Sequence, residues 1–213
     1  LFHAVALMAR RKESLEPIRV DVEKAGGRAI AVEVDAGSVP SVAAGFALAR
    51  GELGPADVFI YNAGTFAMGS VLELDPAAFE QGFRINCAGA LLGAQQVLPA
   101  MLQNERGTIL LTGATASLRG GARFAGFATG KFALRALAQS MARELHPRGI
   151  HVAHVIIDGQ IDTARVRSRG GADRDPATML SPDAIAETYW QLHAQHPTSW
   201  THEIDLRPSL EKF

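Results

Sequence analysis

The sequence predicts a doubly wound α/β domain built on a parallel sheet. Short apolar runs of β type alternate along the chain with longer helical runs. The apolar runs lack the polar alternation of a strand with one wet face, and unbroken runs are typical of strands covered by helices on both faces. Because 213 residues suit one domain, we expect 1–213 to form a single α/β unit.

The strands are predicted from short apolar runs rich in branched side chains. Each is separated from the next by a helical run or a polar turn. In chain order the expected strands are 5–8, 29–34, 57–61, 108–112, 150–157 and 201–206.

The helices are predicted from longer amphipathic runs and their end signals. Gly26 and Gly27 end the first helix, and Asp75 is placed to cap a long helical stretch that we expect to contain a break. In chain order the expected helices are 12–25, 40–50, 75–102, 124–145 and 182–193.

Composition excludes several classes of function. A net charge of −1 and a pI near 6.7 give no electrostatic footprint for nucleic acid or an anionic membrane. A single cysteine, Cys87, excludes an internal disulfide and a thiolate zinc cluster, and it fits the reducing cytoplasm. No apolar run approaches the ~20 residues of a membrane span.

We expect no metal site. His151 and His154 lie in one expected strand and point to opposite faces, since side chains alternate along a strand. The polar segment 168–178 has two interpretations, a surface loop or a mobile lid over a substrate.

Several short motifs follow the ends of the expected strands or lie in the helices. They are Ala9-Arg10-Arg11, Val34-Asp35, Tyr61-Asn62-Ala63-Gly64, Ile85-Asn86 with Gly89, Lys131, and Asp158-Gly159-Gln160-Ile161-Asp162-Thr163. In this order and spacing, from residue 4 to about 165, the chain resembles the short-chain dehydrogenase/reductase family. The resemblance implies a Rossmann-type three-layer sandwich that binds NAD(P), and a homodimer or homotetramer.

The resemblance assigns most of these residues to the cofactor. Asp35 would accept a hydrogen bond from the adenine amino group, with Ala36 alongside. Asn62-Ala63-Gly64 would let the backbone approach the adenine ribose, which small residues permit. In the loop that Gly159 opens, Ile161 and Thr163 would hold the carboxamide of the nicotinamide.

Two further residues are implied to assist catalysis. Lys131 would bind the nicotinamide ribose, and its charge would lower the pKa of a neighbouring acid. Asn86 would hold a water molecule that links the lysine to solvent. Local alternatives exist for each: Asp35 as a helix cap, Asn86 as a helix-break residue and Lys131 as a solvated side chain.

Arg10 and Arg11 bear on the choice of cofactor. Enzymes that use NAD place an acidic residue after the corresponding strand to bind the ribose 2′-hydroxyl. Here Ala9 is followed by two arginines, and a guanidinium can bind a 2′-phosphate bidentately. We therefore expect NADP to be preferred over NAD. The alternative is that Arg10 is only a surface charge.

The chain departs from the family at its start. Family members begin with a strand, a glycine-rich turn and a helix, and no Gly-x-x-x-Gly-x-Gly occurs here. The turn binds the pyrophosphate, and its strand lies between those expected at 5–8 and 57–61. We expect a gap of about 10 Å there, two strand spacings wide, and a fragment of a longer protein.

The second departure concerns the catalytic acid. The family has a tyrosine four residues before the lysine and a serine about 13 residues earlier, and these positions hold Phe127 and Ala114. Neither can donate a proton. Thr115, one residue from the serine position, is a candidate substitute. Losing a general acid typically costs 10²–10⁴-fold in rate.

Two functions remain open. The first is an NAD(P)-dependent oxidoreductase that acts on a small alcohol or carbonyl with an altered acid. The second is a dinucleotide-binding protein without turnover, acting as a sensor or assembly partner. Phe127 and Ala114 favour the second, whereas Asn86, Lys131 and Thr163 favour the first.

Overall fold

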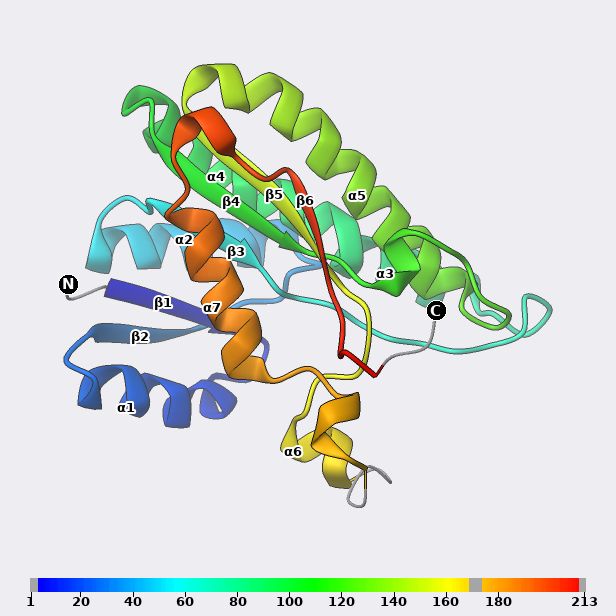
Figure 1. Cartoon of the computed structure of the whole chain (residues 1–213). Helices are drawn as coiled ribbons and strands as arrows, with labels where there is room; N and C mark the ends of the chain where they lie inside the picture. Colours follow the sequence, from blue (N-terminus) through cyan, green and yellow to red (C-terminus); the bar gives the residue numbers. More distant parts are fainter. Residues whose placement is uncertain (1–3, 169–173, 211–213) are drawn as a thin grey trace.

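The computed structural model describes residues 4–168 and 174–210 as parallel strands with helices packed on both faces (Figure 1). Every paired strand is parallel to its neighbour. The fold class predicted from the sequence is confirmed. The strands are β1 (Ala4–Ala9), β2 (Arg28–Glu33), β3 (Val58–Tyr61), β4 (Gly107–Thr112), β5 (Ile150–Ile157) and β6 (Glu203–Leu206).

These strands form two sheets rather than one. β1 pairs only with β2, and the second sheet has the order β3-β4-β5-β6. No residue of β1 is fully buried, and Ile60 of β3 is 48% exposed, whereas every residue of β5 is buried. Strands inside a parallel sheet are covered on both faces. The facing edges of β1 and β3 are therefore left incomplete by the described residues.

The helices cover the four-stranded sheet from both sides. In β4, Ile109 and Leu111 pack in the core cluster beneath α4 and α5, while Leu110 packs with Tyr189 and Leu192 of α7 on the other face. The helices are α1 (Glu16–Lys24), α2 (Val39–Leu53), α3 (Pro76–Phe83), α4 (Gly89–Gln103), α5 (Ala125–Leu145), α6 (Ala164–Val166) and α7 (Pro182–His193).

Most predicted elements are present with shifted ends. The helix expected at 12–25 begins as a 3₁₀ turn, Lys12–Leu15, and α1 follows with a proline in its first turn, where a missing N–H costs nothing. The stretch expected at 75–102 is interrupted by a π-helical turn, η2 (Arg84–Ala88). The three-residue elements α6 and η3 (Thr115–Ser117) were not predicted, because they are too short for a helical period to show.

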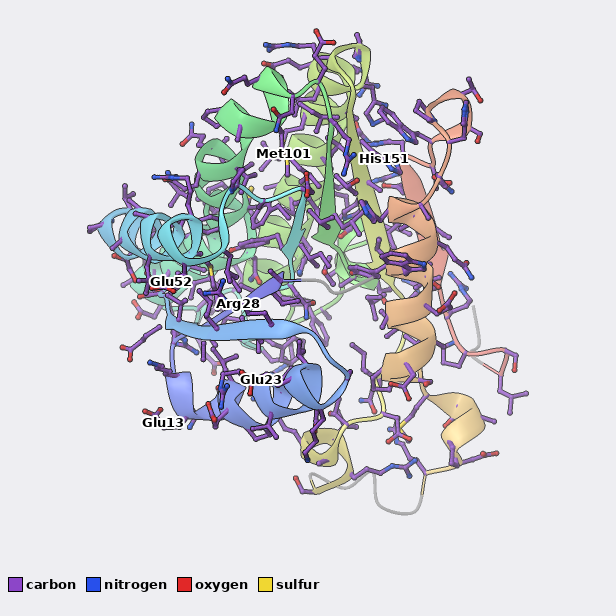
Figure 2. All side chains as sticks on the ribbon, turned by 90° about the vertical axis from the view of Figure 1, so that its left-hand side faces the viewer. Glu13, Glu23, Arg28, Glu52, Met101 and His151 are labelled. Atoms are coloured by element: carbon purple, nitrogen blue, oxygen red, sulfur yellow. The ribbon has the colours of Figure 1, made fainter. Side chains whose placement is uncertain are left out.

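An ion pair joins β2 to α2 at the protein surface. Arg28 and Glu52 lie 3.4 Å apart (Figure 2), with both side chains more than half exposed, and exposed pairs contribute little stability. In the described part of the chain, the helical stretch Pro76–Gln103 is long and apolar enough to cross a membrane. Half of its most apolar window is buried inside the protein, and core helices of soluble proteins meet the same criterion.

Candidate functional site

The candidate residues gather where the parallel strands end. Arg10 and Arg11 follow β1, the turn 62–64 follows β3, Thr115 follows β4, and the loop 158–163 follows β5. The carboxyl ends of parallel strands share one edge of a sheet, and open α/β sheets bind ligands there.

Lys131 lies buried on α5 at this edge. Its side chain donates a hydrogen bond of 2.7 Å from Nζ to the carbonyl oxygen of Thr112, and the residue is 5% exposed. A Cβ built at Gly64 would lie 3.8 Å from Nζ, so the turn after β3 passes close to the lysine. Burial lowers the pKa of Lys131 to about 8. The alternative of a solvated side chain is therefore wrong.

Asn86 lies in the π-helical turn η2 and is also buried. Its Nδ2 donates to the carbonyl oxygen of Thr65 at 2.9 Å, and its Oδ1 accepts from the backbone N–H of Thr65 at 3.0 Å. A Cβ at Gly130 would lie 2.7 Å from the Cβ of Asn86, so α5 approaches η2 through a glycine. Asn86 thus fixes the loop after β3 against the helix that carries Lys131.

Asp35 and Ala36 form the turn between β2 and α2. One carboxylate oxygen of Asp35 accepts from the backbone N–H of Gly37 at 2.9 Å. The helix cap is Ser38, whose hydroxyl accepts from Ser41, so the alternative that Asp35 caps the helix is wrong. A Cβ at Gly89 would lie 2.5 Å from the carbonyl oxygen of Ala36, which places this turn against the start of α4.

The loop after β5 is held in a defined conformation. Gly159 has φ +152°, and a Cβ there would lie 2.9 Å from the ring of Pro208, so glycine is required. Ile161 bridges to Leu180, and the hydroxyl of Thr163 accepts from the first turn of α6 at 3.3 Å. These contacts position Ile161 and Thr163 beside the carboxyl ends of β4 and β5.

Thr115 is engaged by a residue that sequence reasoning missed. Its hydroxyl donates a short hydrogen bond to the carboxylate of Asp158, which is buried and also paired with Arg207 at 2.7 Å. In the structure the Thr115 proton is therefore committed to Asp158. The signal in the sequence was an acidic residue directly after the apolar run 150–157.

The position of the family's tyrosine is filled by an aromatic cluster. The ring of Phe127 lies 5.1 Å from that of Phe66, which in turn lies 5.6 Å from Phe124, measured between ring centres. The Nζ of Lys131 is 5.9 Å from the centre of the Phe127 ring. Apolar rings therefore line the side of the site on which the family places its proton donor.

Behind Ala114 lies a buried polar chain. The Ala114 N–H donates to the hydroxyl of Ser117 at 3.2 Å, and this hydroxyl lies 3.3 Å from Nε2 of His154. The other ring nitrogen of His154 is 3.0 Å from Glu203, which Arg135 of α5 binds with two contacts of 2.7 Å. The chain holds the loop after β4 to β5, β6 and α5.

His151 and His154 point to opposite faces of β5, as predicted. His151 stacks on Trp200 at 4.9 Å between ring centres, whereas His154 contacts Ser117 and Glu203. In the part of the chain that the structure describes, no three histidine, cysteine or acidic side chains are arranged to hold a metal ion.

Arg10 and Arg11 line an open cavity of about 980 Å³. The remaining lining comes from Ala164, Arg165 and Ser168, on and after α6. This cavity joins the end of β1 to the segment that follows the 158–163 loop. Its lining has the positive charge that the phosphates of a dinucleotide require.

The segment 168–178 is described only in part, because residues 169–173 lie outside the described residues. Beside them, Arg167 binds both carboxylate oxygens of Asp162, at 2.7 and 2.8 Å, and Arg174 donates to Gln160 at 2.7 Å. Both contacts tie the segment to the 158–163 loop. The lid interpretation stays a prediction.

Comparison with known proteins places this geometry in a family. The family model of the short chain dehydrogenases matches residues 2–173. The chain belongs to the short-chain dehydrogenase family. Its similarity to 2-(S)-hydroxypropyl-CoM dehydrogenase 2 of Xanthobacter autotrophicus, a relative described as inactive, is 31% identity over 173 residues, covering 81% of this chain and 74% of the relative.

Other relatives of this short-chain dehydrogenase are enzymes by name. It is 28% identical to (-)-trans-carveol dehydrogenase of Rhodococcus erythropolis, covering 93% of this chain and 72% of the relative. It is 29% identical to the 3-ketodihydrosphingosine reductase of Mus musculus, covering 86% of this chain but only 55% of the length of that reductase.

Solved structures share the fold of this short-chain dehydrogenase. A short-chain dehydrogenase from Rhodopseudomonas palustris is 38% identical, with a TM-score of 0.81, and the match covers 96% of this chain and 86% of the other. A metagenomic short-chain oxidoreductase in complex with NADP is 26% identical, with a TM-score of 0.83, and covers 98% and 86% of the two chains.

Proposed function

We propose that this short-chain dehydrogenase is an NAD(P)-dependent oxidoreductase acting on a small alcohol or carbonyl compound. The observation that carries the proposal is the burial of Lys131 beside the turn after β3, with a pKa of about 8. A bound nicotinamide would supply or accept a hydride. Lys131 would bind its ribose, and Asn86 fixes the loop that Lys131 approaches.

Two features at the carboxyl ends of the strands support such a cofactor. The turn at Gly64 passes close to the buried Lys131, and the cavity after β1 is lined by Arg10, Arg11 and Arg165. The residues that we propose for the cofactor are Arg10, Arg11, Asp35, Ala36, Asn62, Ala63, Gly64, Lys131, Gly159, Ile161 and Thr163.

Steady-state turnover tests the proposal. The complete protein is mixed with NADPH or NADH and a broad panel of carbonyl compounds, and with the oxidised cofactors and alcohols. We expect turnover on at least one small substrate and its loss in Lys131→Met. Names of relatives support the substrate class, since (-)-trans-carveol dehydrogenase and 2-(S)-hydroxypropyl-CoM dehydrogenase 3 are both named for alcohols.

We further propose that NADP is preferred, because Arg10 and Arg11 follow β1 where an acidic residue would bind a 2′-hydroxyl. The similar oxidoreductase solved with NADP supports this choice. NADPH should bind several-fold more tightly than NADH in calorimetry, and Arg10→Ala should remove the difference. Equal affinities in the unmutated protein would contradict the preference.

The second candidate function is dinucleotide binding without turnover, as a sensor or assembly partner. It is favoured by Phe127, packed between Phe66 and Lys131 where the family places its acid. One relative, 31% identical to this chain, is itself described as inactive. Tight binding of NADPH together with no turnover across the panel would favour this function.

The broken sheet supports a further proposal, that residues 1–213 are one dinucleotide-binding domain lacking its central strand. β1 and β3 present edges that pair with nothing in the described residues, and Ile60 is left half-exposed. A strand with a glycine-rich turn and a helix, roughly 30 residues in all, would fill the gap. A polypeptide extended in this way should unfold cooperatively at a higher temperature than 1–213, and an equal Tm would oppose the proposal.

We propose a cytoplasmic homodimer or homotetramer. Leu91 of α4 and Phe132 of α5 are 41% and 42% exposed on the outer face of the two long helices, and Cys87 is a free, buried thiol. Apolar side chains of this kind are covered in stable interfaces. Light scattering should show an oligomer that Leu91→Glu dissociates.

A further inference from the structure

The cavity after β1 is lined by an arginine that neither the family's motifs nor the sequence reasoning assigns. Arg165 lies on α6 (yellow in Figure 1), two residues after Thr163. It lines the same cavity of about 980 Å³ as Arg10 and Arg11, although some 155 residues separate the two segments. The fold therefore brings three arginines from two distant segments to one cavity.

These three charges have no anionic partner in the described part of the chain. Within residues 4–168 and 174–210, no ion pair joins Arg10, Arg11 or Arg165 to an acidic side chain. Arginines close by behave differently, since Arg19 binds Glu16 and Glu23 and Arg167 binds Asp162. Like charges that converge without a counterion repel one another, so the cavity is suited to an anion.

The position of the cavity indicates which anion it receives. Arg10 and Arg11 follow β1, and Arg165 follows the loop that would clamp the nicotinamide, so the cavity spans the path along which the proposed cofactor would lie. Guanidinium groups bind phosphate oxygens bidentately. A dianionic phosphate would be neutralised by two or three of these side chains.

We infer that Arg165 binds a phosphate group of the dinucleotide together with Arg10 and Arg11. The inference rests on the proposed function, because it names a further ligand of the proposed cofactor. The phosphate is either the 2′-phosphate or the pyrophosphate, and both present the same oxygens. Arg165 also lies two residues after Thr163, which caps α6.

Calorimetry of the complete protein with NADPH and with NADH tests the inference. Arg165→Ala should weaken NADPH binding at least tenfold, and Arg165→Lys should weaken it less, because the charge remains but the planar fork is lost. A loss confined to NADPH assigns Arg165 to the 2′-phosphate, whereas an equal loss with NADH assigns it to the pyrophosphate. In either case the slope of affinity against salt concentration should become shallower.

Arg143→Ala is the matched control. Arg143 is an exposed arginine near the end of α5, its guanidinium donates to the carbonyl oxygen of Gln139, and it does not line the cavity. This variant should bind both dinucleotides as the unmutated protein does. Because Arg165 is an exposed side chain, the Tm of Arg165→Ala should be unchanged, and this measurement excludes misfolding as the cause.

Failure of the inference on Arg165 can be distinguished from failure of the proposed function. Unchanged binding of both dinucleotides by Arg165→Ala, alongside a loss in Arg10→Ala, would overturn the role of Arg165 and leave the proposed function standing. If the unmutated complete protein binds neither NADPH nor NADH, the proposed function fails, and the inference fails with it.

Discussion

The ammonium group of Lys131 lies 5.9 Å from the centre of the Phe127 ring. The charge that would lower the pKa of a phenol is therefore in place, while the hydroxyl is absent. Phe127→Tyr would put a phenol beside Lys131, and Ala114→Ser would add the second carbonyl-binding hydroxyl. We predict that the double variant reduces reactive test carbonyls at least tenfold faster than the unmutated protein, since general acids typically contribute 10²–10⁴-fold.

Phe124→Tyr is the control for this gain. Phe124 belongs to the same aromatic cluster, 5.6 Å from Phe66, but it does not lie over Lys131 in the described contacts. It should leave the rate unchanged. A double variant that binds NADPH yet remains inert would show that the pocket admits no substrate, and the function without turnover would replace the enzyme.

The pKa of Lys131 predicts how the free energy of unfolding changes with pH in the alkaline range. Its folded pKa of about 8 lies below the unfolded value of 10.5. Between these values the unfolded chain binds more protons, so the free energy of unfolding rises with pH. We compare the free energies of unfolding of the unmutated protein and Lys131→Met. Between pH 7.5 and 9.5, the value for the unmutated protein should rise by about 1–2 kcal/mol relative to that for Lys131→Met.

Urea unfolding at the two pH values measures this difference. Lys24→Met is the matched control, because the side chain of Lys24 is 75% exposed and its removal should not alter the pH dependence. Parallel pH profiles for Lys131→Met and the unmutated protein would show that Lys131 titrates as an exposed lysine does.

The fold could be predicted because it follows from periodicity. Unbroken apolar runs such as 150–157 are typical of strands covered on both faces, and β5 is buried at every residue. The gap between β1 and β3 was expected from the resemblance, because family members have a strand between these two, and in the described residues the two strands lie in separate sheets. Helix ends and the three-residue α6 could not be predicted, because capping and tertiary contacts decide them.

Candidate residues of the site were identified where they belong to motifs of fixed order and spacing. Lys131 and Asn86 were found because their motifs have fixed spacing. Asp158 and Arg165 were missed, because their partners lie far away in the sequence and no local pattern links Thr115 to Asp158 or Arg10 to Arg165. Pairings of this kind depend on how the elements pack.

Thr115 provides a prediction for catalysis. Its hydroxyl lies beside the position of the family's serine and donates its proton to the buried carboxylate of Asp158, so its oxygen can accept a hydrogen bond from the hydroxyl of an alcohol substrate. Thr115→Val removes the hydroxyl but preserves the ion pair of Asp158 with Arg207. We expect kcat/KM to fall at least tenfold and Thr115→Ser to retain most activity. Thr129→Val, on an exposed position of α5, should have no effect, and an active Thr115→Val would remove Thr115 from the catalytic residues.

The buried His154 predicts loss of stability in weak acid. His154 is 0% exposed, and burial lowers its pKa despite the contact with Glu203. The unfolded histidine titrates near 6.5, so below this pH the unfolded chain takes up a proton that the folded protein resists. Stability is therefore complete above pH 6.5 and declines as pH falls toward the folded pKa. At pH 5.5 the loss is at most about 1.4 kcal/mol for this histidine.

Unfolding in urea at pH 7.5 and 5.5 tests this prediction. His154→Gln retains polar contacts to Ser117 and Glu203 but does not titrate, so its stability should fall less between the two pH values. His196→Gln replaces an exposed histidine and should follow the unmutated protein. Glu203, which contacts His154, does not contribute to this loss. Its hydrogen bond to Arg135 lowers its pKa, so the stability that Glu203 contributes is lost only in stronger acid. The same loss in His154→Gln as in the unmutated protein would assign the acid sensitivity to another group, of which His151, buried with a lowered pKa, is the next to test.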